Sequence, residues 1–336
     1  MSQPVLQVRD LAVSFGSDDG RIKALDGVNF ELHSGDVLGI VGESGCGKSV
    51  TALSLMRLLP QPMGRIESGE ILFKGQDLAK CSPEDLLKIR GRQIAMIFQE
   101  PMTALNPVYT VGHQLHETYK LHFPELSNAD IFKRSIDILQ EVGIPEPGLR
   151  LTEYPHQLSG GMRQRVMIAI ALACEPDILV ADEPTTALDV TIQAQILELM
   201  LALQKKKNMA IIMITHDLGV VAQICQRLMV MYAGRAVEEG PIKDIFKKPS
   251  HPYTHGLLSS IPTADLPRKS KLKTISGMVP SLKNMPPGCR FQNRCPLVIE
   301  DCKDKVPPKA QINQTHGVWC IRHKDVEELS DASRRA

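Results

Sequence analysis

The sequence has no excess of charge of either sign and no long apolar run. It contains 39 lysine and arginine residues against 38 aspartate and glutamate residues, a formal net charge of +1. Such a balance gives no global field that would favour nucleic acid or an anionic membrane. The longest apolar stretch, VMIAIALA at residues 166–173, is far shorter than the ~18 residues that a membrane span needs. We therefore expect no nucleic-acid partner and no transmembrane helix.

The N-terminus also lacks the pattern of a secretory signal peptide. MSQPVLQVRDLAVSF alternates like a β-strand and has no basic region followed by an apolar core. The composition is 43% hydrophobic, which is ample for a sizeable core. We expect a globular cytosolic protein, and in that reducing compartment clustered cysteines are more often metal ligands or redox groups than disulfides.

The chain divides into two unequal parts. Apolar strands alternate with amphipathic segments up to about residue 245, which predicts an α/β fold with a mostly parallel sheet covered by helices. Strand-like runs thin out in a helical insertion at about 101–165, where SNADIFKRSIDILQEVG has an Asn/Asp start and a glycine stop. Dense prolines predict an irregular C-terminal extension at 246–325, and we expect a disordered tail at 326–336.

A phosphate-binding loop follows the strand VLGIV. GESGCGKS at residues 42–49 fits G-x-x-x-x-G-K-[ST] in the required context of strand, loop and helix. The glycines let backbone N–H groups turn onto phosphate oxygens, and the following helix adds its positive N-terminus. Lys48 would reach the β and γ phosphates, and the Ser49 hydroxyl would bind Mg²⁺. The predicted ATP-binding loop comprises Gly42, Glu43, Ser44, Gly45, Cys46, Gly47, Lys48, Ser49 and Val50.

Two acids end another apolar strand, in ILVADE at residues 178–183. An acid at a strand end can hold Mg²⁺, and a neighbouring carboxylate can orient the attacking water and accept its proton. We assign Asp182 to the metal and Glu183 to the water. Two adjacent acids alone are a weak signal that often marks only a solvated turn, so their meaning depends on the phosphate-binding loop.

The order of these motifs resembles that of the ABC-type ATPases. LSGGMRQR at residues 158–165 looks like the signature motif of that family, and it lies between the phosphate-binding loop and the acidic strand. The resemblance implies a P-loop ABC-type nucleotide-binding domain over 1–245. It also implies roles for Gln99 as the Q-loop glutamine, Asp189 at the D-loop position, His216 as the switch histidine and Phe15 as the aromatic that stacks on adenine.

The signature motif supplies a second phosphate clamp in this family. Ser159, Gly160 and Gly161 lie where a helix should begin, so small residues and the helix dipole can approach a γ phosphate. The family sandwiches ATP between two nucleotide domains, with Gln99 sensing Mg²⁺ and the attacking water, and His216 contacting the γ phosphate. The resemblance therefore implies ATP and Mg²⁺ as cofactors and a second ABC ATPase subunit, a related non-identical chain, as partner.

The C-terminal part narrows the resemblance to bacterial importers. HPYTHGLL at 251–258, EPMTALNP at 100–107 and the cysteine-bearing tail resemble the dipeptide, oligopeptide and nickel importer ATPases, most closely the dipeptide/oligopeptide D-type subunit. This implies a peripheral protein on the cytoplasmic face of the bacterial inner membrane. Its partners would be two transmembrane permease subunits and, indirectly, an extracytoplasmic substrate-binding protein. By itself HPYT is only a proline-containing turn and receives no role.

Other functions fit the sequence less well. Import of nickel or another small solute is the alternative to peptide import, because only the resemblance identifies the substrate. A soluble ribosome-acting ABC ATPase would carry two sets of motifs, and a DNA-repair ATPase would need a long coiled coil between Lys48 and Ser159. An exporter would commonly have fused membrane spans.

Half of the eight cysteines lie close together near the end of the sequence. Cys289, Cys295, Cys302 and Cys320 have the spacing C-x5-C-x6-C-x17-C, which lacks the C-x2-C knuckles of common zinc sites. Four thiolates suit either Zn²⁺ or an iron-sulfur cluster, and free or locally packed thiols remain an alternative. The family resemblance points to a [4Fe-4S] cluster that would clip the tail together without a part in hydrolysis.

Overall fold

The computed structural model describes residues 3–17, 20–99, 104–186, 188–261 and 274–329. Residues 100–103 of EPMTALNP, residue 187 of TALDV and residues 330–336 of the expected tail lie outside these ranges. Contacts between Cα atoms divide the chain into two compact units. The first unit holds residues 1–5, 32–36 and 80–213, and the second holds residues 6–31, 37–79 and 214–336.

The first unit combines parallel strands with a group of helices. Its strands follow the order β8-β7-β6, and β7 runs parallel to β6 with Ile178 opposite Ile94. All five residues of β7 are buried, as is typical of a strand covered on both faces. The strands are β6 (Ile94–Ile97), β7 (Ile178–Asp182) and β8 (Ala210–Ile214).

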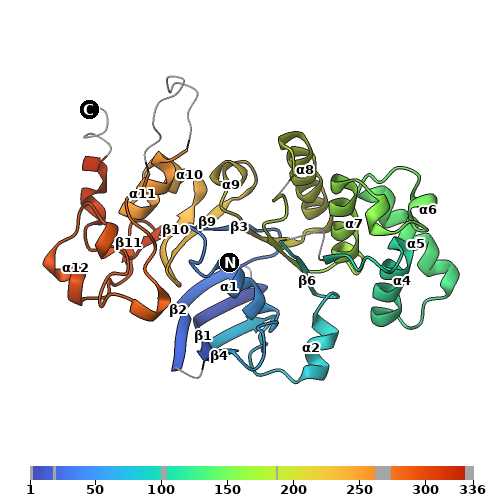
Figure 1. Cartoon of the computed structure of the whole chain (residues 1–336), viewed down its shortest axis with the longest axis horizontal. Helices are drawn as coiled ribbons and strands as arrows, with labels where there is room; N and C mark the ends of the chain where they lie inside the picture. The colour runs from blue at the N-terminus through green and yellow to red at the C-terminus, as the bar shows by residue number, and fades with distance from the viewer. Residues whose placement is uncertain (1–2, 18–19, 100–103, 187, 262–273, 330–336) are drawn as a thin grey trace. The chain divides into compact units, whose positions relative to one another are not determined.

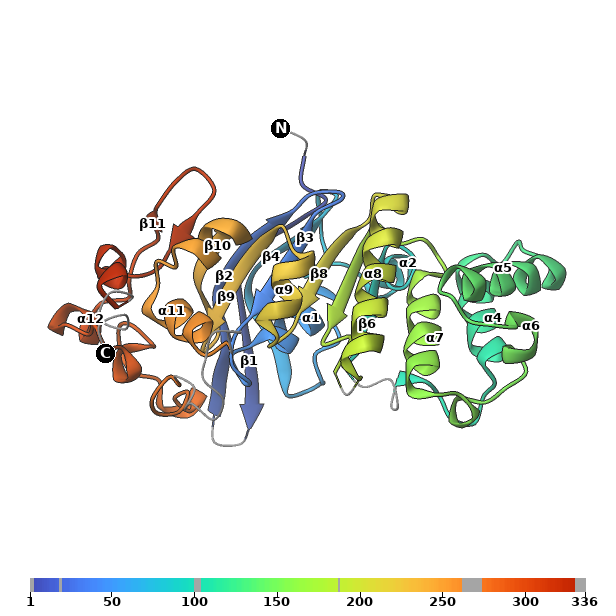
Figure 2. The ribbon, with the colours of Figure 1, turned by 90° about the horizontal axis from the view of Figure 1, so that it is seen from above.

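The helices α4 to α7 of this unit lie side by side in both views (Figure 1, Figure 2). SNADIFKRSIDILQEVG forms a helix, as its sequence indicates: Ser127 Oγ accepts a hydrogen bond from the Asp130 N–H at 3.2 Å, and Gly143 follows with φ 74°. The helices of the unit are α2 (Pro83–Ile89), α4 (Val111–His122), α5 (Asn128–Glu141), α6 (Pro147–Arg150), the 3-10 turn η1 (Pro155–Gln157), α7 (Gly160–Leu172) and α8 (Val190–Lys207).

The second unit contains strands in two sheets. One has the order β2-β1-β4-β5, with β1 antiparallel to β4; its strands are β1 (Leu6–Ser17), β2 (Gly20–Leu32), β4 (Gly64–Phe73) and β5 (Gln76–Asp77). The other has the order β11-β12-β10-β9-β3, with β3 parallel to β9; its strands are β3 (Val37–Val41), β9 (Arg227–Tyr232), β10 (Arg235–Pro241), β11 (Ala310–Gln311) and β12 (Gly317–Val318).

Short helices complete the second unit, and one of them, α10, lies beside β10 in Figure 1. They are α1 (Lys48–Leu55), α9 (Leu218–Ile224), α10 (Ile242–Lys247), α11 (Pro252–Ser259), α12 (Glu300–Asp304) and the 3-10 turns η2 (Leu282–Asn284), η3 (Gln292–Arg294) and η4 (His323–Asp325).

A buried carboxylate fastens the extension to β10. Glu238 is fully buried, and its oxygens accept hydrogen bonds from the N–H groups of Ser250 at 2.7 Å and His251 at 3.0 Å. Nε2 of His316 lies 2.8 Å from the same carboxylate. A buried carboxylate is tolerated only when such partners replace water. Glu238 therefore joins the start of α11 and the turn before β12 to one strand.

The edge of this sheet is built from the extension itself. β12 pairs antiparallel with β10, and the N–H of Trp319 donates to the Val237 carbonyl at 2.9 Å. Lys309 Nζ lies 5.1 Å from the centroid of the Trp319 ring, within the range of a cation–π contact. The extension therefore contains short helices and turns, as expected of an irregular segment, but it also adds β11 and β12 to the edge of the sheet.

The end of the described chain is ordered beyond the expected start of the tail. Residues 326–329 form a helical turn, and the side chain of Val326 is 1% exposed. Burial of an apolar side chain is the force that orders this segment. Among the described residues, no helix combines the length and apolar character that crossing a bilayer requires.

His251 should make stability depend on pH. It caps α11 by accepting the Tyr253 N–H on Nδ1 at 3.0 Å, and burial lowers its pKa to about 3, below the ~6.5 of an unfolded chain. As pH falls, the unfolded chain binds a proton at this histidine before the folded chain does. The contribution of neutral His251 to the free energy of unfolding is therefore fully present above about pH 6.5. It falls by up to about 1.4 kcal/mol per pH unit as pH drops toward about 3.

We expect His251→Asn, which retains a cap acceptor without a titrating ring, to flatten this loss. Thermal unfolding at pH 7.5, 6.5, 5.5 and 5.0 would show a smaller decrease in Tm than in the parent protein. The exposed His156 provides the control, His156→Asn, whose curve should parallel that of the parent. Parallel curves for His251→Asn as well would contradict the assignment.

Candidate functional site

The backbone of the phosphate-binding loop requires its glycines. Gly42 has φ 152°, and a Cβ there would lie 2.2 Å from the Met231 carbonyl oxygen. Gly47 has φ 106° and caps α1 in the left-handed region; a Cβ at that position would lie 2.7 Å from Leu25. Both positions exclude other residues, since the backbone conformation and the close neighbours leave no room for a side chain. The loop therefore turns directly from buried β3 into α1.

Lys48 and Cys46 point toward the protein rather than toward solvent. Lys48 is 6% exposed, and its Nζ donates to the carbonyls of Gly42 at 2.8 Å and Glu43 at 3.2 Å. Cys46 is fully buried, its carbonyl accepts the Gly234 N–H at 2.8 Å, and burial raises the pKa of its thiol. Only the backbone of Cys46 could therefore contact a bound anion. Ser44 and Gly45 are exposed at the tip of the loop.

His216 and Phe15 belong to the same unit as the loop. His216 is exposed in a turn whose neighbours are fixed: the Asp217 N–H donates to Thr215 Oγ1, and Asp217 caps α9. The Thr215 N–H donates to Ile40 of β3 at 3.3 Å, so this turn starts beside the strand that feeds the loop. Phe15 on β1 lies opposite Gly64 of β4, where a Cβ would approach its ring to 2.9 Å.

The two acids of the first unit differ in their surroundings. Asp182 is 4% exposed at the end of β7. Glu183 is half-buried and has φ 49°, in the left-handed region that residues other than glycine rarely adopt. Its Oε2 accepts hydrogen bonds from Gln99 Nε2 at 3.1 Å and from Thr186 Oγ1 at 3.0 Å. The structure therefore brings Gln99 and Glu183 together, and strained backbone of this kind is common at functional sites.

The signature motif forms an open helix start. Ser159 caps α7 by accepting the Met162 N–H at 3.3 Å, and a Cβ on Gly160 would meet nothing within 4 Å. Gly161 lies closer to its surroundings, with Ile192 at 3.1 Å from such a Cβ. Asp189 is exposed and caps α8 through the Ile192 N–H at 2.9 Å. Both motifs present exposed helix N-termini, where orphan N–H groups and the macrodipole favour an anion.

The four C-terminal cysteines are free thiols that influence one another. Burial raises the pKa of Cys289, that of Cys295 to about 11 and that of Cys320 to about 12, and the neighbouring thiols add to each shift. The Cys289 N–H also donates to the Cys302 carbonyl at 2.9 Å. Within the part of the chain that the structure describes, however, no three histidine, cysteine or acidic side chains are arranged to hold a metal ion. The thiol geometry therefore does not support the expected metal centre.

Two residues that the sequence analysis left without a role contact the phosphate-binding loop. Tyr253 lies in HPYT, which forms the cap and first turn of α11, and its hydroxyl accepts the Glu43 N–H at 2.8 Å. Arg294 forms an ion pair with the Glu43 carboxylate, with a shortest N–O distance of 2.6 Å. More than 200 residues separate these groups from the loop in the sequence, and only tertiary structure brings them to it.

Comparison with known proteins finds sequence matches in two parts of the chain. A sequence model described as ABC transporter matches residues 25–186, and one described as the C-terminal region of oligopeptide/dipeptide transporters matches residues 237–302. A probable peptide ABC transporter ATP-binding protein of Sinorhizobium fredii is 50% identical over 325 residues, 97% of each chain. The dipeptide transport ATP-binding protein DppD of Bacillus subtilis is 52% identical over 318 residues, 95% of this chain and 94% of that one.

The chain belongs to the ATP-binding subunits of ABC transporters. This confirms the family expected from the motifs, and as a member the protein is an ABC-type ATPase. Solved structures confirm the fold. MJ0796, described as a bacterial ABC transporter cassette, has a TM-score of 0.63 at 27% identity and covers 70% of this ABC subunit and 98% of its own chain. CbiO1 of Clostridium perfringens has the same score at 30% identity, with coverages of 74% and 92%.

Proposed function

We propose that this ABC subunit hydrolyses ATP to power the import of dipeptides or oligopeptides through a partner membrane permease. The assignment of peptides as substrates rests on one observation. Relatives that match almost the whole chain are named as peptide transport proteins. DppD and the oligopeptide transport protein OppD of Bacillus subtilis are 52% and 49% identical to it. The match of residues 237–302 to the oligopeptide/dipeptide C-terminal region supports the same substrate class.

The proposal places the subunit in a larger assembly. One set of ABC motifs requires a second ATP-binding subunit, for which we propose a related chain, and MJ0796 was solved as a dimer. The remaining partners are two transmembrane permease subunits and, indirectly, an extracytoplasmic substrate-binding protein. The subunit would then associate peripherally with the cytoplasmic face of the inner membrane.

The roles within hydrolysis are part of the proposal and are those that the family motifs imply. Lys48 and the loop N–H groups of residues 42–50 neutralise the phosphates, while Phe15 contacts adenine. Asp182 and Gln99 of the first unit and the Ser49 hydroxyl of the second each offer an oxygen ligand of the kind that Mg²⁺ prefers. When bound, Mg²⁺ supplies Lewis-acid stabilisation of charge on the phosphates.

The remaining roles concern the water and the γ phosphate. Glu183, oriented by Gln99 and Thr186, polarises the attacking water. His216 contacts the γ phosphate. Ser159, Gly160 and Gly161, with Asp189, act on the nucleotide held by the partner subunit. The reaction then depends on positioning and electrostatics without a covalent intermediate.

The proposed function is tested with the assembled transporter. We expect the chain, co-expressed with its permease pair and second ATPase, to co-purify as a complex whose ATPase rate in proteoliposomes rises with peptide-loaded binding protein. Lys48→Ala should abolish this activity, because each charge-assisted contact to phosphate contributes roughly 1.5 to 3 kcal/mol. Failure to co-purify would contradict transport, and stimulation by nickel but not by peptide would contradict the substrate class.

Glu183→Gln tests the assignment of the water-activating residue. We expect the variant to bind ATP with unchanged affinity but to lose steady-state turnover by at least about 100-fold, since an amide cannot accept the proton. The exposed Glu84→Gln, on α2, is the matched control and should retain full turnover. Normal hydrolysis by Glu183→Gln would refute the role.

The [4Fe-4S] cluster stays a prediction that rests on the family resemblance and on the clustering of Cys289, Cys295, Cys302 and Cys320 in the sequence. Iron and acid-labile sulfide measured after anaerobic purification should each reach about four per chain, the stoichiometry of a [4Fe-4S] centre, and Cys302→Ser should abolish both. Cys81→Ser, at a cysteine outside this group, is the control. Protein without iron and sulfide under these conditions would exclude the cluster, and stoichiometric zinc would favour the alternative centre.

A further inference from the structure

Glu43 places a negative charge inside a loop that binds anions. GESGCGKS contains one acidic residue, and the Glu43 side chain is about one-third exposed. An uncompensated carboxylate there would oppose the phosphates of ATP, because like charges repel most strongly where water is partly excluded. The loop therefore needs either a neutral residue at this position or a fixed countercharge.

Arg294 of the extension supplies that countercharge in a bidentate pair. Its Nη1 donates to Glu43 Oε2 at 2.6 Å and its Nη2 donates to Oε1 at 3.0 Å. Two parallel bonds of this kind define the geometry of both partners as well as neutralising them. The Arg294 side chain is only 4% exposed, so the pair is screened less than an ordinary surface ion pair.

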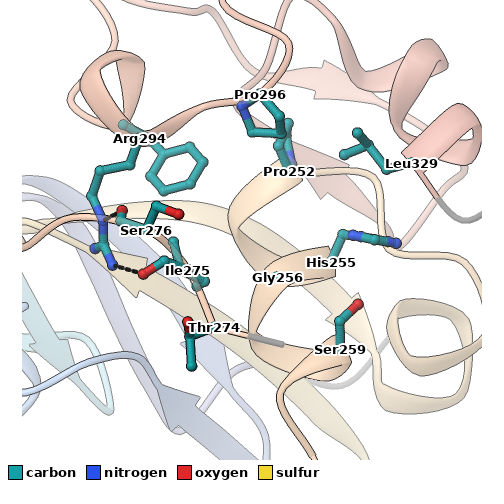
Figure 3. A pocket seen from close by; sticks show the side chains of 11 residues that line it. Pro252, His255, Gly256, Ser259, Thr274, Ile275, Ser276, Arg294, Pro296 and Leu329 are labelled. Carbon is teal, nitrogen blue, oxygen red and sulfur yellow. Dashed lines mark hydrogen bonds between the residues drawn. The ribbon is translucent and has the colours of Figure 1, made fainter. Parts of the chain in front are cut away.

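The remaining hydrogen bonds of Arg294 anchor it to its own surroundings. Nε donates to the Ser276 carbonyl at 2.9 Å, Nη2 to the Ile275 carbonyl at 3.3 Å and Nη1 to the Tyr232 hydroxyl at 3.4 Å. Together with the two bonds to Glu43, these occupy the five donors of a guanidinium. Arg294 also lines a pocket of about 290 Å³, and Figure 3 shows its bond to Ile275 at the wall of that pocket. The guanidinium is therefore held in place before any ligand binds.

Tyr253 fixes the backbone of the same loop residue. Its hydroxyl accepts the Glu43 N–H at 2.8 Å, and its ring belongs to a buried cluster with Tyr232 and Phe291. The ring centroids in this cluster are 4.7 to 5.4 Å apart, a spacing that favours aromatic pairs. Since Lys48 Nζ also contacts the Glu43 carbonyl, the amide, carbonyl and carboxylate of this residue each have a defined partner.

We propose that Arg294 and Tyr253 are positioning residues of the ATP site, through which the C-terminal extension sets the affinity of the phosphate-binding loop. Arg294 neutralises the Glu43 carboxylate, and Tyr253 holds the Glu43 amide in the conformation that the loop needs. This inference rests on the proposed role of the loop in binding ATP. Neither residue touches the reacting atoms, so their loss raises the KM for ATP and leaves kcat nearly unchanged.

The test measures KM and kcat for ATP in the assembled transporter. We expect Arg294→Ala to raise KM about five- to tenfold and Tyr253→Phe about threefold, effects of the size expected for single polar contacts. The decisive variant combines Arg294→Ala with Glu43→Gln. Removing the unpaired charge should return KM to within about twofold of the parent value. A purely structural role of Arg294 would show no such rescue.

Arg322→Ala is the matched control, because Arg322 pairs with Asp325 inside the extension; its KM should not change. A loss of kcat with constant KM in Arg294→Ala, or no rescue by Glu43→Gln, would overturn the inference. If Arg294→Ala does not fold, the test uses Tyr253→Phe, which retains the ring. An unchanged KM for ATP in that variant would overturn the inference. The proposed function itself is contradicted if the parent complex does not hydrolyse ATP, or if Lys48→Ala leaves its ATPase activity unchanged.

Discussion

The buried carboxylate of Glu238 is the contact on which the second unit depends. A buried carboxylate costs free energy when it leaves water, and the N–H groups of Ser250 and His251, with Nε2 of His316 at 2.8 Å, compensate this cost. Through them one residue of β10 fixes the start of α11, which carries Tyr253, and the turn before β12. This junction positions the extension together with the pairing of β12 with β10 and the ion pair between Arg294 and Glu43.

The sequence predicts the parts whose chemistry is local. The loop at 42–49, the cap and glycine stop of α5 and the apolar strands all follow from short-range rules, because the residues that determine them are adjacent in the chain. The sequence also predicts Glu183 and Gln99, although nothing in its pattern reveals that Gln99 donates to Glu183 or that Glu183 adopts a left-handed backbone. Family motifs indicated their roles, and the contact between them required the fold.

The extension shows where prediction from sequence ends. Proline density indicates an irregular segment, yet β11 and β12 extend a sheet. The sequence does not predict these strands, because two residues are too few to show the alternation of a β-strand. The HPYT stretch at the start of α11 gives Tyr253 no evident role in the sequence, and Arg294 is one arginine among many. Their importance comes from contacts over more than 200 residues. The four C-terminal cysteines are the reverse case, because they are close in sequence but the described side chains are not arranged as a set of metal ligands.

Trp319 is the single tryptophan of the chain, and it lies in the extension beside Cys320 and against Lys309. Its backbone N–H donates to the Val237 carbonyl of β10, and its indole ring lies against Lys309. Intrinsic indole fluorescence therefore reports on the extension alone. Emission from this one ring can distinguish melting of the C-terminal module from melting of the first unit, without any added label.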